Sequence, residues 1–428
     1  MAGAYGGIRL LVWLLTRAAL LLCVLKAVPF PGPDVTTDVS VIYQGWYEVL
    51  RTGVFPPDDV AWQYPPGAAL AVLSPGLLPF LGYAGAFFLL VLLCDALVYG
   101  LLEYAAGRAG GSARGVWAWI AGVPLLGPTG YARYDLMVTA VAVAALLAGA
   151  RRPRVLGVLA GFGALLKVWP VLLLVGLARG RTARRAWGAA ALTAGGLTLA
   201  AAAAMPGALA FASSQRDRGT EVESLGALVF HLARHAGWAG EVRLNYGSME
   251  FLGPYVPLVS ALALALAAAA AGWLGVWRLR TRVRGPGVPA DAAFTAVLLF
   301  TVTSRVISPQ YLLWLVGLAA VCLVSHGGRM GLPAALVLAA TGVTVLEFPV
   351  WFAHVVASDP LGVGLIAVRN GLLVAAAGVA CRRLWRGTVP GRAGAAVAAA
   401  ALGDGARSVP GHVPHQGPED RARARGAR

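Results

Sequence analysis

Charged residues are scarce in this sequence, and acidic residues especially so. Of 428 residues only 13% are Asp, Glu, Lys or Arg, with 19 acidic against 35 basic side chains, while 58% are hydrophobic. This composition excludes an ordinary series of soluble domains and predicts an all-α polytopic membrane protein. The basic surplus does not indicate nucleic acid, because most arginines lie in short links between apolar runs and in the C-terminal tail, a pattern that reports membrane topology.

Cysteine is also rare, and each cysteine stands alone in an apolar run without C-x-x-C or histidine spacing. The sequence therefore predicts neither a disulfide framework nor a zinc site. His231 and His235 are four residues apart, but without further ligands they indicate solvated or locally paired side chains. We predict no metal and no cofactor. The four cysteines are Cys23, Cys94, Cys322 and Cys381.

Several catalytic signatures are missing. There is no Walker G-x-x-x-x-G-K-[ST] motif, no strand-linked G-x-G-x-x-G, no H-E-x-x-H and no G-x-S-x-G elbow. No segment has room for the soluble α/β domain that a cytosolic nucleotide-sugar site needs. A nucleotide-binding or hydrolase domain is therefore excluded.

Apolar runs dominate the chain. A membrane-spanning helix needs about 20 apolar residues, whereas seven shorter runs, between 116 and 349, must tilt or end at an aqueous cavity. We predict about 11 to 13 transmembrane or re-entrant helices, with 67–82 lying at the interface or re-entering and a break at Lys167–Pro170 within a hairpin over 155–178. The clear candidate spans are 8–28, 83–105, 186–206, 255–277 and 361–381.

Arginine-rich links mark the cytoplasmic side under the positive-inside rule. With both termini inside, every polar cluster falls on the outer side, which predicts an outward-facing site. We expect a membrane domain over 1–385, with outer loops at 29–66 and 207–254, and a disordered basic cytoplasmic tail over 386–428. The further outer clusters are 128–135, Lys167, 304–310 and 350–360.

The stretch from Thr37 to Pro66 is polar, acidic and aromatic, in contrast to the apolar runs around it. Asp38 follows a proline-rich exit from the first helix, and a carboxylate held beside apolar walls suits a general base. Alternatively, Asp38 caps the next helix. Asp58 and Asp59 are adjacent, so a divalent ion bound by this pair remains an alternative, although the sequence has no D-x-D motif.

The aromatic residues of this stretch have two interpretations. Their faces and hydroxyl groups suit sugar rings, but they also suit the water–membrane interface. Two prolines fix the backbone after Tyr64, which makes 62–66 less typical of an interfacial belt. The residues concerned are Tyr43, Trp46, Tyr47, Trp62 and Tyr64.

Six charges lie on the outer side or within the membrane, where a cation usually has an anionic partner. Two or three cations that converge bind phosphate well, because arginine offers a planar fork and lysine a point charge. The alternative is internal pairing, such as Arg133 with Asp135. The six are Arg133, Asp135, Lys167, Arg216, Arg218 and Arg305.

Five stretches in this order resemble a known family. They are the residues Asp38, Tyr43, Trp46, Gly53 and Trp62–Gly67 of the first loop, then Arg133–Asp135, Lys167–Pro170, Gln215–Ser224 and Ser304–Trp314. The chain resembles the bacterial polyprenol-phosphate-mannose-dependent mannosyltransferases, glycosyltransferase family 87 with the GT-C fold.

The resemblance implies that Asp38 is the catalytic base, that Arg133, Lys167 and Arg305 bind the phosphate of a polyprenyl-phosphate sugar, and that no metal is required. It implies transfer of a sugar, expected to be mannose, to a glycolipid or lipoglycan at the outer face of a bacterial plasma membrane. The rival function is a transporter or flippase of lipid-linked sugars; a ligase acting on lipid pyrophosphate fits less well. The residues expected to contact sugar or acceptor are Tyr43, Trp46, Trp62, Gln63, Tyr64, Asp135, Arg216 and Gln310.

Overall fold

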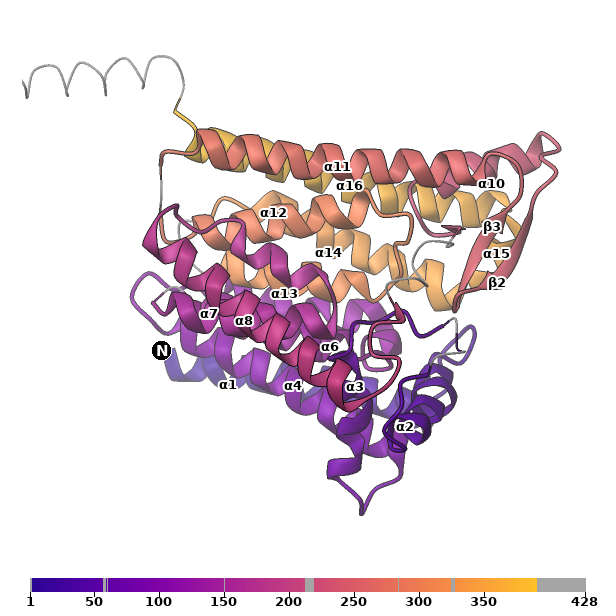
Figure 1. Ribbon diagram of the computed structural model, residues 1–428, viewed down its shortest axis with the longest axis horizontal. Helices are drawn as coiled ribbons and strands as arrows, with labels where there is room; N and C mark the ends of the chain where they lie inside the picture. Colours follow the sequence, from indigo (N-terminus) through magenta and orange to yellow (C-terminus); the bar gives the residue numbers. More distant parts are fainter. Residues whose placement is uncertain are drawn as a thin grey trace, which may run out of the picture.

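The computed structural model describes residues 2–56, 59, 61–149, 151–211, 219–283, 285–324 and 328–390. The protein is a bundle of helices with one small sheet at its end (Figure 1). This confirms the predicted all-α membrane fold. The α-helices are α1 (Ala2–Val24), α2 (Gln44–Leu50), α3 (Ala68–Leu73), α4 (Tyr83–Ala106), α5 (Arg114–Gly122), α6 (Asp135–Gly149), α7 (Pro153–Leu166), α8 (Arg181–Ala204), α10 (Ala227–His235), α11 (Val256–Arg280), α12 (Val288–Val302), α13 (Tyr311–Leu323), α14 (Gly331–Val345), α15 (Phe352–Ala357) and α16 (Pro360–Thr388).

Shorter elements interrupt and connect these helices. Two are π-helical, η1 (Asp38–Tyr43) and η5 (Leu346–Val350). Three are 3₁₀-helical, η2 (Ser74–Leu77), η3 (Pro124–Gly130) and η4 (Trp169–Leu174). The strands are β1 (Thr220–Glu221), β2 (Glu241–Asn245) and β3 (Ser248–Leu252).

Six helices in the described part of the chain are long and apolar enough to cross a membrane. Five coincide with the clear candidate spans. The sixth corrects the prediction that 332–349 is too short, because α14 continues into η5 and gives a 20-residue helix. The six are Gly6–Val24, Tyr83–Ala106, Arg181–Ala204, Val256–Arg280, Gly331–Val350 and Pro360–Thr388.

The remaining apolar helices are short, as predicted, and one of them ends at the expected break. Helix α7 ends at Leu166, and Lys167 is extended, with φ −158° and ψ 139°, before η4 begins. The segment 67–82 forms only a short helix, α3 with η2, rather than a span. At the other end of the chain, α16 continues to Thr388, past the expected tail boundary at 385; residues 391–428 lie outside the described part.

A buried ion pair joins the first helix to the bundle. Arg17 on α1 donates from Nε to Asp95 Oδ2 on α4 at 2.9 Å, and both side chains are almost fully buried. Trp13, Trp119 and Tyr131 also donate to this carboxylate, at 3.0, 2.8 and 2.8 Å. Arg17 therefore faces the bundle interior, which is the arrangement an ionised group in a membrane helix requires.

We expect Asp95→Ala to destabilise the protein strongly, because it leaves Arg17 buried without its counter-charge. Removal of one partner of a buried ion pair costs about 3 to 5 kcal/mol. The matched control is Glu103→Ala on the same helix, whose partner Arg9 is also on α1 but is partly exposed. Thermal unfolding in detergent should show a large fall in midpoint for Asp95→Ala and a small one for the control; equal shifts would contradict the prediction.

Residues 219–254, within the predicted second outer loop, fold into a small unit that the sequence did not predict. Its antiparallel sheet has the order β1-β3-β2, with Phe251 opposite both Thr220 and Val242. Tyr246 and Gly247 form the two-residue turn of the hairpin with φ of 48° and 75°, as a tight hairpin requires. At the right of Figure 1 this hairpin lies with α10 and α15 at one end of the bundle.

A second hydrophobic cluster fixes this unit to the last helices. Phe251 of β3 and Phe230 of α10 pack with Ile366 of α16. His231 bonds the carbonyl of Val222 and the hydroxyl of Ser358, both at 2.8 Å, and His235 Nε2 lies 2.8 Å from the carbonyl oxygen of Ser358. The histidines are thus locally paired, as predicted.

Candidate active site

A cavity of about 610 Å³ opens where several segments between helices meet. This volume is typical of a small-molecule site. Its wall combines the first loop, the break after α7, the hairpin tip and the segment before α13. The predicted site residues that line it are Asp38, Tyr43, Trp46, Gln63, Tyr64, Arg133, Lys167, Arg305 and Gln310.

Two predicted site residues do not line the cavity, and a third is not described. Asp135 is 1% exposed and lies behind the wall. Trp62 is buried and packs edge-on against Trp46 and Tyr64, with ring centroids 5.1 and 6.0 Å apart. Arg216, like Arg218 and Asp58, lies outside the described residues.

Asp38 is the first residue of η1 and is paired rather than capping. Its Oδ2 lies 2.8 Å from Arg133 Nη2, and about a third of its side chain is exposed. Thr37 is the N-cap position, and there is no side-chain capping bond. The capping interpretation is therefore wrong, and Asp38 has its carboxylate on the cavity wall.

Arg133 is fixed on several sides. Its Nη1 donates to the carbonyl oxygens of Val35 at 3.0 Å and Ala132 at 2.8 Å, while Nη2 pairs with Asp38. Burial acts to lower the pKa of Arg133, but Asp38 and neighbouring groups raise it above its ordinary value, so the guanidinium stays charged. The alternative pairing of Arg133 with Asp135 is not the one found.

Lys167 occupies an aromatic cage. Its Nζ lies 2.7 Å from Asp135 Oδ1, which also accepts from Trp314 Nε1 at 2.7 Å. The carboxylate thereby orients the ammonium from behind, and the rings favour a cation between them. The four rings are Tyr64, Tyr134, Tyr311 and Trp314, with centroids 5.5, 5.3, 5.4 and 5.1 Å from Nζ.

A close approach of two segments brings the first loop to Lys167. A Cβ at Gly67 would lie 2.8 Å from the backbone of Leu165, so only glycine allows this contact. The Pro65-Pro66-Gly67 sequence thus places Tyr64 against the end of α7. A larger residue at Gly67 would therefore push the first loop away from the end of α7, and these are two walls of the site.

The aromatic residues of the first loop face inward. Tyr43 and Trp46 are only 2% and 5% exposed, which excludes an interfacial belt for them. Trp46 Nε1 donates to Asp59 Oδ2 at 2.6 Å, and Gln63 Nε2 donates to the Tyr246 carbonyl at 3.0 Å. Asp59 therefore fixes the indole ring of Trp46, and Gln63 joins the first loop to the hairpin tip.

Two glutamates of the cavity wall, Glu221 and Glu223, have no predicted site role, although they belong to the Gln215–Ser224 stretch. Glu221 accepts from the Ile307 amide at 2.7 Å and the Ser308 hydroxyl at 2.9 Å. Its own amide donates to the Arg305 carbonyl at 3.1 Å. Glu221 thus shapes the segment that carries Arg305. Within the described ranges, no group of three or more His, Cys, Asp or Glu has metal-binding geometry.

Comparison with protein families decides the identity. The model of glycosyltransferase family 87 matches residues 62–309, more than half of the chain. The chain belongs to glycosyltransferase family 87. No curated protein and no solved structure shows a significant match.

This family 87 protein is therefore a membrane glycosyltransferase. The match includes Arg133, Lys167 and Arg305 but begins after Asp38. The assignment of Asp38 thus rests on its place in the cavity and on its pairing with Arg133, not on the family match.

We expect Glu221→Gln to weaken binding of the sugar donor. An amide replaces one acceptor oxygen with a donor, so the Ile307 amide or the Ser308 hydroxyl loses its partner and the Arg305 segment shifts. The loss of a bond to a charged acceptor costs about 1.5 to 3 kcal/mol, which predicts a KM for donor about 10- to 100-fold higher. Ser308→Ala, which removes one bond only, should give a smaller increase; an unchanged KM in Glu221→Gln contradicts the prediction.

Proposed function

We propose that this glycosyltransferase moves mannose from a polyprenyl-phosphate donor to a hydroxyl group of a glycolipid or lipoglycan at the outer face of a bacterial plasma membrane. The observation that carries the proposal is the composition of the cavity wall. A carboxylate, Asp38, shares one cavity with the cations Lys167 and Arg305 and with aromatic side chains. This set supplies a base, a phosphate site and walls for sugar rings.

In this reaction Asp38 acts as general base. Its carboxylate accepts the proton of the acceptor hydroxyl, and that oxygen attacks the anomeric carbon of the donor sugar. The bond from the anomeric carbon to the phosphate oxygen breaks, and its electron pair leaves with the lipid phosphate. Arg133 holds the carboxylate in position through the 2.8 Å pair.

Lys167 and Arg305 bind the leaving phosphate. Arg133 lies on the same cavity wall, where it pairs with Asp38. An ammonium carries three N–H donors, so the pair between Lys167 and Asp135 is compatible with a further bond to a phosphate oxygen. Cations placed where negative charge develops stabilise the transition state. Tyr43, Trp46 and Tyr64 form the aromatic wall for the sugars.

Membership in a glycosyltransferase family favours an enzyme over the transporter or flippase. The donor is tested by reconstituting the full chain in liposomes with polyprenyl-phosphate mannose and a glycolipid extract. Release of polyprenyl phosphate with mannosylated product supports the proposal. Product formed equally well from a nucleotide sugar, or no consumption of the lipid donor with any acceptor, would overturn it.

We expect the hairpin and the first loop to be outside the membrane. A single cysteine placed at Gly45 or Arg243, in a chain whose four native cysteines are replaced, should react with a membrane-impermeant thiol reagent in intact cells. Labelling only after the membrane is permeabilised would reverse the topology and the outer-face assignment. A cysteine at Arg181, on the opposite arginine-rich side, serves as control.

A further inference from the structure

One carboxyl group of the cavity wall has no assigned task in this chemistry. Glu223 lines the cavity and is only 5% exposed. Its Oε1 is buried and receives no hydrogen bond from an N–H or hydroxyl group in the part of the chain that the structure describes. An unsatisfied buried polar atom costs about 1 to 3 kcal/mol, so a group kept in this state at a cavity wall points to a ligand.

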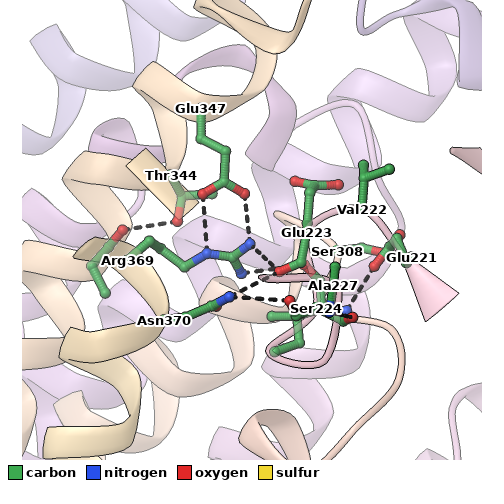
Figure 2. A network of polar contacts seen from close by, with 12 residues as sticks. Glu221, Val222, Glu223, Ser224, Ala227, Ser308, Thr344, Glu347, Arg369 and Asn370 are labelled. Atoms are coloured by element: carbon green, nitrogen blue, oxygen red, sulfur yellow. Dashed lines mark hydrogen bonds and ion pairs between the residues drawn. The ribbon is translucent and has the colours of Figure 1, made fainter. Parts of the chain in front are cut away.

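The backbone of Glu223 is fixed, while its side chain is not tied to a cation. Its carbonyl oxygen accepts from Arg369 Nη2 at 2.7 Å and from Asn370 Nδ2 at 3.3 Å (Figure 2). The guanidinium of Arg369 pairs with Glu347 instead, at 2.6 and 3.1 Å. The carboxyl group of Glu223 shares a hydrogen bond with the carboxyl group of Glu347 instead of pairing with a cation.

The surroundings of Glu223 favour its neutral form. Burial, then the nearby carboxylates Glu221 and Glu347, and also a hydrogen bond with Glu347 raise the pKa of Glu223 well above its ordinary value, against the opposing effect of Arg369. A protonated carboxyl group has one O–H donor and keeps acceptor capacity. One hydrogen bond goes to Glu347, and the remaining acceptor capacity suits a ligand hydroxyl group, which can donate to it.

We propose that the carboxyl group of Glu223 hydrogen-bonds a hydroxyl group of the hexose carried by the lipid donor. The inference rests on the proposed function and assigns a sugar-specificity residue within it. Phosphate is the wrong partner for this position, because Glu221 and Glu347 lie beside it. A site built to bond a substrate hydroxyl discriminates strongly against a ligand that lacks it.

The test measures binding, without turnover, of two ligands to the purified full chain in nanodiscs. The ligands are polyprenyl-phosphate mannose and bare polyprenyl phosphate, and the readout is the ratio of their Kd values. Glu223→Ala should reduce the preference for the sugar-bearing lipid about 10- to 100-fold, as expected for one or two lost hydrogen bonds. Binding of the bare lipid should not change, which also shows that the variant folds.

Glu223→Gln keeps a donor and an acceptor, so it should retain most of the preference for the sugar-bearing lipid.

The pH dependence of this preference follows from the raised pKa of Glu223. In the wild type, the neutral acid prevails below the pKa of Glu223, so the preference falls as pH rises through it. Glu223→Gln should lose this fall. The charged groups that act on Glu223, namely Glu221, Glu347 and Arg369, are the same in both proteins.

The control is Glu241→Gln, the same change on the β2 strand, where Glu241 is exposed and pairs with Arg243 at 2.7 Å. An unchanged ratio in Glu223→Ala, or a Glu223→Gln variant as impaired as Glu223→Ala, would overturn the inference. If Glu223→Ala does not fold, the pH profile of Glu223→Gln decides alone. If the wild type binds neither lipid, the proposed function itself fails, which is a distinct result.

Discussion

Replacing Asp38 by asparagine is expected to lower turnover about 10²- to 10⁴-fold, the usual contribution of a general base. The amide oxygen of asparagine can still accept from Arg133, so the buried guanidinium keeps a partner and the fold of the site is preserved. Asparagine cannot take the proton of the acceptor hydroxyl. The loss should therefore appear in kcat, while KM for the lipid donor changes little.

The control for this experiment is Asp34→Asn. Asp34 lies in the same loop but pairs with Lys26 on an exposed surface at 2.8 Å, so its replacement should leave kcat within a few-fold of wild type. Both variants are compared in liposomes at equal amounts of inserted protein. An Asp38→Asn enzyme that keeps more than about a tenth of wild-type kcat, well above the range expected for loss of a general base, would remove Asp38 from that role.

Replacing Lys167 by methionine is expected to raise KM for the lipid donor on the order of 10²-fold or more, because loss of a buried hydrogen-bonded charge costs about 2 to 5 kcal/mol. Methionine keeps the apolar stem of lysine within the cage of four rings. It removes only the charge that would meet the phosphate. Binding of bare polyprenyl phosphate should weaken by a similar factor.

The single variant also leaves Asp135 buried without its cation, which by itself destabilises the protein. The double variant Lys167→Met with Asp135→Asn removes both charges, so it should recover thermal stability without recovering donor binding. Recovery of both would show that Lys167 acts only by neutralising Asp135. A single variant that is stable and binds donor normally would exclude Lys167 from the phosphate site.

Local sequence signals determined much of the fold. The five clear candidate spans rest on composition over about 20 residues, a property that no tertiary contact can change. The break at Lys167–Pro170 was also predictable, because proline lacks the amide that would continue a helix. Run length alone underestimates α14: the apolar run 332–349 predicts a helix too short to span, whereas α14 with η5 gives a 20-residue span, Gly331–Val350, that is kinked at Phe348, with φ −143° and ψ 123°.

The candidate site was predicted as a set of residues rather than as a geometry. Lys167 and Arg305 were identified because a charge near a membrane is costly and usually has a partner. Asp38 was identified because it follows the proline-rich exit from the first helix and matches the carboxylate of the family that the chain resembles. Their partners could not be deduced, since each lies far away in sequence. A pair of Arg133 with Asp135 was one alternative, but Arg133 pairs with Asp38, and Asp135 pairs with Lys167. The short strands of the second outer loop were missed because their residues alternate too briefly to give a period of two.

By itself, the sequence determined that this chain is a helical membrane protein with an acidic and aromatic first loop, because hydrophobicity and residue type are local properties. Only the tertiary structure decided which charges neutralise each other and which face the cavity. That choice depends on packing between distant segments, such as those of Glu223 and Arg369, which are 146 residues apart. In the structure, Asp38 has Arg133 as an oriented partner and Asp135 lies behind Lys167. The carboxyl group of Glu223 lies at the cavity wall without a cation of its own.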